Sequence, residues 1–203
     1  MTTPDFSIEA AAKSKGFNFV CGVDEAGRGP LAGPVYAAAV ILPENCIIEG
    51  LNDSKKLSEA KREKLYDVII ESAISYCIAS ASVEEIEEHN ILNATYLAMN
   101  RAINGLNVPA DYALIDGNRI PTDIKVPCEY VIKGDAKSYS VAAASILAKV
   151  TRDRVMDEMD AKYPQYQFKK HKGYGTKVHT EAIIKYGPSE IHRMSFLKKL
   201  LNK

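Results

Sequence analysis

The sequence predicts an α/β domain in which short strands alternate with helices. Short apolar runs rich in β-forming residues recur along the chain, and longer stretches with helical character separate them. The chain has 203 residues, of which 46% are hydrophobic and 26% charged, as is usual for a globular protein of one generous domain. No apolar run approaches the roughly 18 residues that a membrane-spanning helix needs, so we expect no membrane contact.

The first half of the chain supplies three predicted strands and one predicted helix. The strands are at 17–23, 35–42 and 74–81, and the helix is at 58–71. The short connection between the first two strands predicts that they pair antiparallel. In the helix, Leu65, Val68 and Ile69 are expected to face inward.

The second half is predicted to be richer in helix. Ser82 and Glu85 form a capping-box pattern, which predicts a helix to Asn104 with a break near His89–Asn90 and an end at Gly105. Further strands are predicted at 112–115 and 130–132, and further helices at 140–162 and 177–186. The 140–162 segment is alanine-rich and has no Gly or Pro, so it is expected to be the longest helix.

The chain divides into three parts by composition. Residues 1–16 form a small-residue N-terminal extension, 17–162 the main domain, and 163–203 a helical, basic C-terminal part. Residues 162–203 hold ten Lys and Arg against two Asp and Glu, although the net charge of the whole chain is zero. A basic region beside an acidic one is typical of a nuclease that grips a polyanion. A solvated basic helix pair would show the same charge distribution.

Cysteine usage and the N-terminus bear on location. The four cysteines are scattered without metal-ligand spacing, which indicates a reducing compartment. The first residues are polar and acidic, unlike a signal peptide. We therefore expect a cytoplasmic protein.

Two adjacent carboxylates, Asp24 and Glu25, follow the first predicted strand and precede a glycine-rich turn. Carboxylates at a strand end suit a hard metal ion that needs oxygen ligands. Neighbouring side chains of a regular strand point to opposite faces, however. Either the strand distorts at Glu25, or one of the two carboxylates is not a ligand.

Asp116 and Asp135 repeat this pattern, because each follows a strand-like run. Taken singly, each is more typical of a turn or a helix start. Three strand ends that all present Asp nevertheless predict a shared site, since the ends of strands converge in α/β sheets. Four carboxylates can hold two divalent ions for phosphoryl transfer, and oxygen ligands favour Mg²⁺ or Mn²⁺ over zinc.

Two glycine-flanked side chains suggest contacts with nucleic acid. Arg28 lies between Gly27 and Gly29, which allow close backbone approach, and its guanidinium suits a phosphate. Tyr174 lies between two glycines in a basic loop, where its ring is free to stack on a nucleotide. A mobile loop whose Tyr packs back on the core is the alternative. Lys55, or its neighbour Lys56, is a candidate phosphate contact.

With these residues in view, the chain resembles bacterial ribonuclease HII over residues 17–197. The resemblance rests on motifs in the family's order at 24–30, 53–57, 115–118, 133–135, 142–153, 171–176 and 192–196. It implies a ribonuclease H-like fold, with a mixed central sheet flanked by helices and a small C-terminal helical part.

The resemblance also implies an activity. Members cleave the RNA strand of RNA–DNA hybrids, and cut on the 5′ side of single ribonucleotides in duplex DNA, leaving a 3′-hydroxyl and a 5′-phosphate. The residues that match the family's metal-binding catalytic carboxylates are Asp24, Glu25, Asp116 and Asp135.

Substrate-binding residues are implied in the same way. Gly27, Arg28 and Gly29 match the loop that reads the ribose 2′-hydroxyl, Tyr174 matches a tyrosine that stacks on the following sugar, and Lys55 matches a phosphate contact. By the same likeness we expect a monomer that uses Mn²⁺ or Mg²⁺. A catalytically silent hybrid-binding protein is the alternative function, and a related nuclease of another substrate class is a second.

Overall fold

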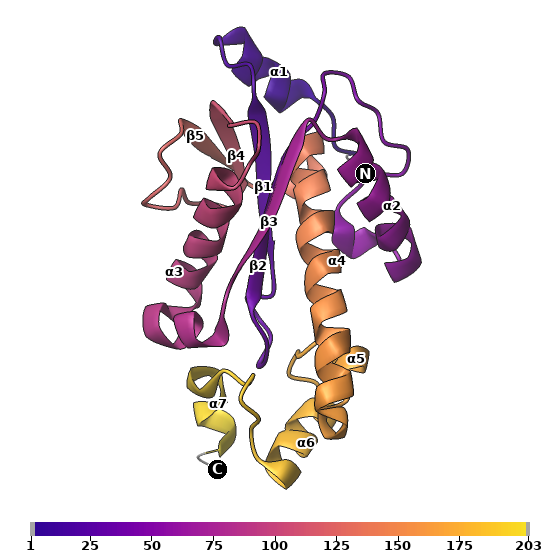
Figure 1. Ribbon diagram of the computed structural model, residues 1–203, viewed down its shortest axis with the longest axis vertical. Coiled ribbons are helices and arrows are strands. Elements are labelled where there is room, and N and C mark those ends of the chain that lie inside the picture. The colour runs from indigo at the N-terminus through magenta and orange to yellow at the C-terminus, as the bar shows by residue number, and fades with distance from the viewer. Residues whose placement is uncertain (1–2, 202–203) are drawn as a thin grey trace.

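The computed structural model describes residues 3–201 and contains one five-stranded mixed sheet (Figure 1). The strands are β1 (Val20–Ala26), β2 (Val35–Ile41), β3 (Ser75–Ala81), β4 (Tyr112–Asp116) and β5 (Cys128–Val131). They lie in the order β3-β2-β1-β4-β5. The pairs β1–β2 and β2–β3 are antiparallel, whereas β1–β4 and β4–β5 are parallel. The predicted mixed sheet is therefore confirmed.

Helices cover both faces of this sheet. They are α1 (Ser7–Ser14), α2 (Glu59–Ser72), α3 (Val83–Asn104), α4 (Tyr139–Lys162), α5 (Phe168–His171), α6 (Lys177–Tyr186) and α7 (Met194–Leu201). Short 3₁₀ turns are η1 (Ser54–Lys56), η2 (Gly134–Ala136) and η3 (Pro164–Tyr166). Figure 1 shows α3 on one side of the strands and α4 on the other, with α5 to α7 gathered at one end of the molecule.

Alternation along the strands divides the core into two layers. Val23 and Ile115 pack with the residues of α3, while Ala38 packs with α2 and α4. The backbones of β1 and the start of α4 are in direct contact at Gly22. A Cβ added there would lie only 2.1 Å from the carbonyl carbon of Ser140. A glycine at this position therefore lets the longest helix settle against the central strand.

Most local predictions for the helices are confirmed. Ser82 and Glu85 form the capping box, and the break in α3 falls at Asn90, which has φ of 64°. One side-chain prediction is wrong: Val68 is 41% exposed, whereas Leu65 and Ile69 of the same helix are buried. The buried stripe of α2 is narrow, so Val68, beside it on the helix surface, is left in solvent.

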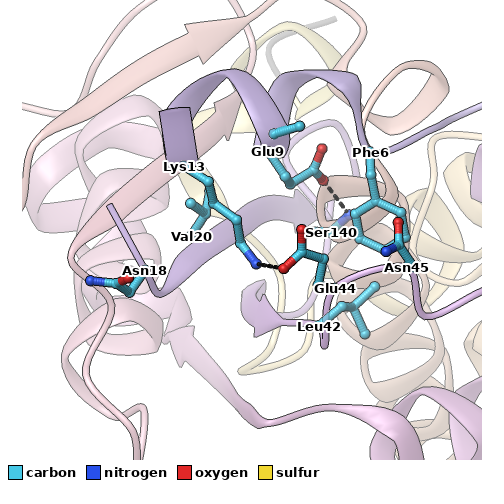
Figure 2. A pocket seen from close by; sticks show the side chains of 10 residues that line it. Phe6, Glu9, Lys13, Asn18, Val20, Leu42, Glu44, Asn45 and Ser140 are labelled. Atoms are coloured by element: carbon cyan, nitrogen blue, oxygen red, sulfur yellow. Dashed lines mark hydrogen bonds and ion pairs between the residues drawn. The ribbon is translucent and has the colours of Figure 1, made fainter. Parts of the chain in front are cut away.

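The N-terminal extension contains α1, which anchors the start of α4. Glu9 is buried, and its Oε1 accepts a hydrogen bond from Ser138 Oγ at 2.6 Å. The same oxygen accepts from Ser140 N at 2.9 Å (Figure 2). The backbone of Asp5 adds bonds to Lys137 and Tyr139. The extension is thus part of the packed structure and fixes the segment that leads from η2 into α4.

The C-terminal helices enclose a small core of their own. Phe168, Ile183 and Leu197 pack there against Ala32 and Met156 of the preceding part of the chain. The division of the chain at 163–203 into a substrate-binding part stays a prediction.

Three histidines extend this small core. His179 Nδ1 lies 2.9 Å from Tyr174 O, and the Nε2 atoms of His179 and His192 are 3.0 Å apart. His192 Nδ1 in turn accepts from Ser189 N at 2.9 Å, and His171 stacks on His179. In this group of three hydrogen-bonded or stacked histidines, each ring nitrogen has a partner when all three rings are neutral.

Within residues 3–201, no helix has the length and apolar character needed to cross a membrane.

Candidate active site

Strand β1 brings the first two carboxylates to the site. It runs through Asp24 and Glu25 to Ala26, further than predicted, and pairs without distortion, with Asp24 opposite Ala38 and Glu25 opposite Ala37 of β2. Asp24 is buried on the α4 side of the sheet, and the alternation places Glu25 on the α3 side. Distortion at Glu25, one of the two alternatives expected from the sequence, is absent, yet both carboxylates line one cavity near the strand end.

Asp116 lies beside them at the end of β4. The two strands are parallel, with Val23 paired to Ile115, so they deliver Asp24 and Asp116 to the same end of the sheet. Asp135 follows in η2 after β5. The amide of Gly134 donates to Asp116 Oδ1 at 2.6 Å and ties this turn to the strand end.

Lys55 joins the carboxylates from another element. Its ammonium lies 3.1 Å from Asp135 Oδ2. Arg62 of α2 holds the turn that carries Lys55, because its Nη1 donates to the carbonyls of Ser54 and Leu57 at 3.1 and 2.6 Å. The structure therefore places Lys55 at the carboxylates, whereas Lys56 is not among the cavity-lining residues.

These side chains line a cavity of about 210 Å³. Its walls are formed by Asp24, Glu25, Ala26, Gly27, Arg28, Gly29, Ser54, Lys55, Asp116, Ser145, Lys149, Arg152 and Tyr174. Eight of the nine predicted site residues are thus brought together. Asp135 does not line the cavity. It is linked to the cavity wall by its hydrogen bond from Lys55, and its neighbour Gly134 donates to Asp116.

Crowding and burial alter the acidity of the carboxylates. Burial, and then the charges of Glu25, Asp116 and Asp135, raise the pKa of Asp24 well above its ordinary value. Burial also raises the pKa of Glu25, although Arg28 opposes the shift. The pKa of Asp116 is raised by burial too, against the lowering effect of the Gly134 amide. Negative charge that Arg28 and Lys55 offset only in part is therefore concentrated at this strand end.

The donor set fits a hard divalent cation, which would relieve this repulsion and prefers carboxylate oxygens. Among residues 3–201, however, no three carboxylate, histidine or cysteine side chains already form a closed ligand cluster. Asp135 is instead paired with the Lys55 ammonium, whose own pKa is lowered by burial but raised on balance by Asp135.

The glycine-rich loop at residues 27–34 forms the second wall and rests on two buried guanidiniums. Arg193 donates to the carbonyls of Gly27, Arg28, Pro30 and Gly33 at 2.6 to 3.0 Å. Arg152 donates to the carbonyls of Ala32, Pro34 and Lys172 at 3.0 to 3.1 Å. Gly27 has φ of 101°, and a Cβ there would lie 2.1 Å from Arg152 Nε, so only glycine fits.

Tyr174 closes this wall. Its ring is 45% exposed and approaches Gly29, where an added Cβ would lie 3.6 Å from Tyr174 Cε1. The amide of Leu31 donates to Gly173 O at 2.8 Å and joins the two loops. The alternative prediction, with the ring folded back into the core, is wrong.

Sequence reasoning gave no role to Arg152 and Arg193, although both lie in motifs that carried the resemblance. Part of the predicted basic surface of the C-terminal part is consequently internal, since Arg193 is fully buried. An arginine that binds only backbone carbonyls leaves no partner residue to find in a sequence.

Comparison with solved structures defines the class. Ribonuclease H2 from Pyrococcus horikoshii superposes with a TM-score of 0.76 at 29% identity, over 91% of this chain and 98% of that one. A Bst ribonuclease HIII in complex with Mn²⁺ shares the fold, with a TM-score of 0.74 at 19% identity over 91% of this chain and 69% of that one. The mixed sheet with its flanking helices is the fold of a ribonuclease H-like nuclease.

Sequence comparison gives the family. Residues 21–199 match the family described as Ribonuclease HII. The ribonuclease HII of Caldicellulosiruptor bescii is 56% identical over 197 residues, which cover 97% of this chain and 95% of that protein. The chain belongs to the ribonuclease HII family and is a hydrolase.

Proposed function

We propose that the protein is an endonuclease that cleaves the RNA strand of RNA–DNA hybrids and cuts on the 5′ side of single ribonucleotides embedded in duplex DNA. The products are a 3′-hydroxyl and a 5′-phosphate. One observation supports this most directly: a single cavity has carboxylates on one wall and a glycine loop with an exposed tyrosine on the other.

The carboxylate wall serves the chemistry. Asp24, Glu25, Asp116 and Asp135 would hold the divalent cations, Mg²⁺ or Mn²⁺. When bound, such ions activate a water for in-line attack and stabilise the leaving oxygen. Lys55, which approaches the carboxylates from η1, contacts a phosphate of the cleaved strand with its ammonium.

The opposite wall serves recognition. The 2′-hydroxyl is the group that distinguishes RNA from DNA at a site. The peptide groups of Gly27, Arg28 and Gly29, which line the cavity, bind this hydroxyl, since glycine offers no side chain to block approach. The Tyr174 ring stacks on the next sugar. We expect the protein to act as a monomer.

The decisive experiment is cleavage of a labelled DNA duplex that contains one ribonucleotide. It is run with Mg²⁺, with Mn²⁺ and with chelator, beside an all-DNA duplex and a long RNA–DNA hybrid. We expect one metal-dependent cut on the 5′ side of the ribonucleotide. Cleavage of the long hybrid alone would retain the carboxylate roles and remove the loop as a junction reader. No cleavage by folded protein would favour a silent hybrid-binding protein.

Tyr174→Ala tests the recognition wall separately. Loss of a stacked ring costs about 1–3 kcal/mol, so kcat/KM on the single-ribonucleotide duplex should fall about tenfold or more. Tyr186→Ala is a matched control, since that ring is also exposed, at 52%, and lies outside the cavity. Equal loss in both variants would remove Tyr174 from the site.

A further inference from the structure

Arg193 contacts the glycine loop in a way that bears on its recognition role. Its guanidinium is fully buried and, among the described residues, pairs with no carboxylate. Its side-chain hydrogen bonds go to backbone carbonyls of the loop. Its guanidinium also lies over the Phe196 ring, 5.2 Å from the centroid. A buried cation without a carboxylate partner is costly, which argues for a task beyond stability.

The contacts fix the orientation of two peptide groups. In a trans peptide, the C=O of one residue and the N–H of the next point in opposite directions. Arg193 Nη2 binds Gly27 O at 2.6 Å and Nη1 binds Arg28 O at 3.0 Å. The N–H groups of Arg28 and Gly29 must therefore point away from the buried guanidinium, towards the cavity side where these residues are exposed.

These two N–H groups are left without acceptors, unlike those of Leu31 and Gly33 later in the loop. The amides of Leu31 and Gly33 donate to Gly173 O and Ile191 O, both at 2.8 Å. Over residues 3–201, no backbone or side-chain acceptor pairs with the N–H of Arg28 or Gly29. The loop thus presents two aligned donors beside the carboxylates.

We propose that Arg193 is a positioning residue for ribonucleotide specificity: by holding the Gly27 and Arg28 carbonyls inward, it aims the Arg28 and Gly29 N–H groups at the ribose 2′-oxygen. This inference rests on the proposed function and adds the residue that sets the reading geometry. Arg152 supports the far end of the same loop and contacts neither of those two carbonyls.

The test measures binding without cleavage. Asp116→Asn protein serves as the parent, and its affinity for a duplex with one ribonucleotide is compared with that for the all-DNA duplex. Arg193→Lys keeps the charge but loses the planar fork. Loss of two hydrogen bonds should lower the ribonucleotide preference by about tenfold or more, with all-DNA affinity unchanged within about twofold.

A matched control separates positioning from loosened structure. Ile183→Ala removes a buried side chain from the small core that also holds the Arg193 region, without touching the loop carbonyls. It should lower the unfolding temperature while retaining the ribonucleotide preference. Full preference in Arg193→Lys, or equal loss in both variants, would overturn the inference. No preference in the parent would instead overturn the proposed function.

A second measurement needs no Arg193 variant and serves if Arg193→Lys does not fold. Amide nitrogen and proton shifts of Arg28 and Gly29 are followed by NMR in the Asp116→Asn protein. Adding the ribonucleotide duplex should shift both amide protons downfield, while the all-DNA duplex should not. Unchanged shifts with bound ribonucleotide duplex would overturn the inference.

Discussion

The carboxylate end of the sheet and the histidine cluster of the C-terminal part are both buried groups of like ionisable side chains. Their hydrogen bonding differs. Each nitrogen of the clustered histidines has a partner. Asp24, Glu25 and Asp116 also accept hydrogen bonds, but these bonds offset only part of their mutual repulsion. A hydrogen-bond network in which every group is paired stabilises the fold. Repulsion that remains between incompletely paired groups can be relieved by a bound ligand. The contrast separates structure from function inside one small chain.

The largest expected effect is at the carboxylate end. Asp116→Asn keeps an oxygen that can accept the Gly134 amide but removes a charge from the cation site. We expect turnover to fall by at least about 10³-fold, equivalent to roughly 4 kcal/mol of transition-state stabilisation. Steady-state kinetics measure turnover, and thermal unfolding without metal should show an unchanged or higher midpoint. A lower midpoint would mean that Asp116 stabilises the fold.

The histidine cluster should respond in the opposite way. His192→Ala removes a ring packed on Tyr166 and Phe168 and leaves His179 Nε2 without a partner. We expect a loss of about 3 kcal/mol in the free energy of unfolding, measured by urea denaturation. The exposed His89→Ala is the control and should change little. Similar stabilities for both variants would contradict the structural role.

The two regions also predict opposite pH dependence. Burial lowers the pKa of His179 and His192 to about 4, below the ordinary 6.5, so the unfolded chain binds more protons and stability falls as pH drops from about 6.5 to 4. The raised carboxylate pKa values act the other way: without metal, stability is lost as pH rises above the ordinary values near 4.

A divalent cation should isolate the histidine contribution. Mg²⁺ offsets the carboxylate repulsion, so stability should rise more steeply between pH 4 and 6.5 with Mg²⁺ than without it. Thermal midpoints across this range, with and without the ion, measure the difference. Parallel curves would show that the carboxylates do not bind the ion.

The smallest expected effect distinguishes two neighbouring lysines. Lys55 pairs with Asp135 and lines the cavity, whereas Lys56 has no such contact. Lys55→Ala should lower kcat/KM by about tenfold through a lost phosphate contact, and Lys56→Ala by less than about twofold. Equal losses would mean that the general charge of the turn matters, not its geometry.

The sequence predicted the sheet, the helices and the gathering of the site because strand ends with carboxylates and glycine turns leave local signals. It did not place Glu25 correctly with respect to the strand, since regular pairing through Ala26 depends on a partner strand. The spacing of apolar residues predicts that Val68 faces inward, but it does not show how much of the helix surface the rest of the protein covers.

The sequence does not predict the roles of Arg152 and Arg193, for a different reason. All their acceptors in the glycine loop are backbone carbonyls more than a hundred residues earlier, and a carbonyl carries no sequence signature. Tertiary structure alone reveals that the two arginines support the loop.

The separation of Arg193 from the loop has a consequence for synthesis of the protein on the ribosome. Arg193 and its acceptor Gly27 are 166 residues apart in the sequence, and Glu9 and its partner Ser138 are 129 residues apart. Since the chain emerges N-terminus first, the carboxylates of β1 are made long before the groups that order their surroundings. The nascent chain therefore lacks a supported glycine loop until almost its whole length is available. A ribonuclease built in this order stays unfinished while it is still beside the RNA that encodes it.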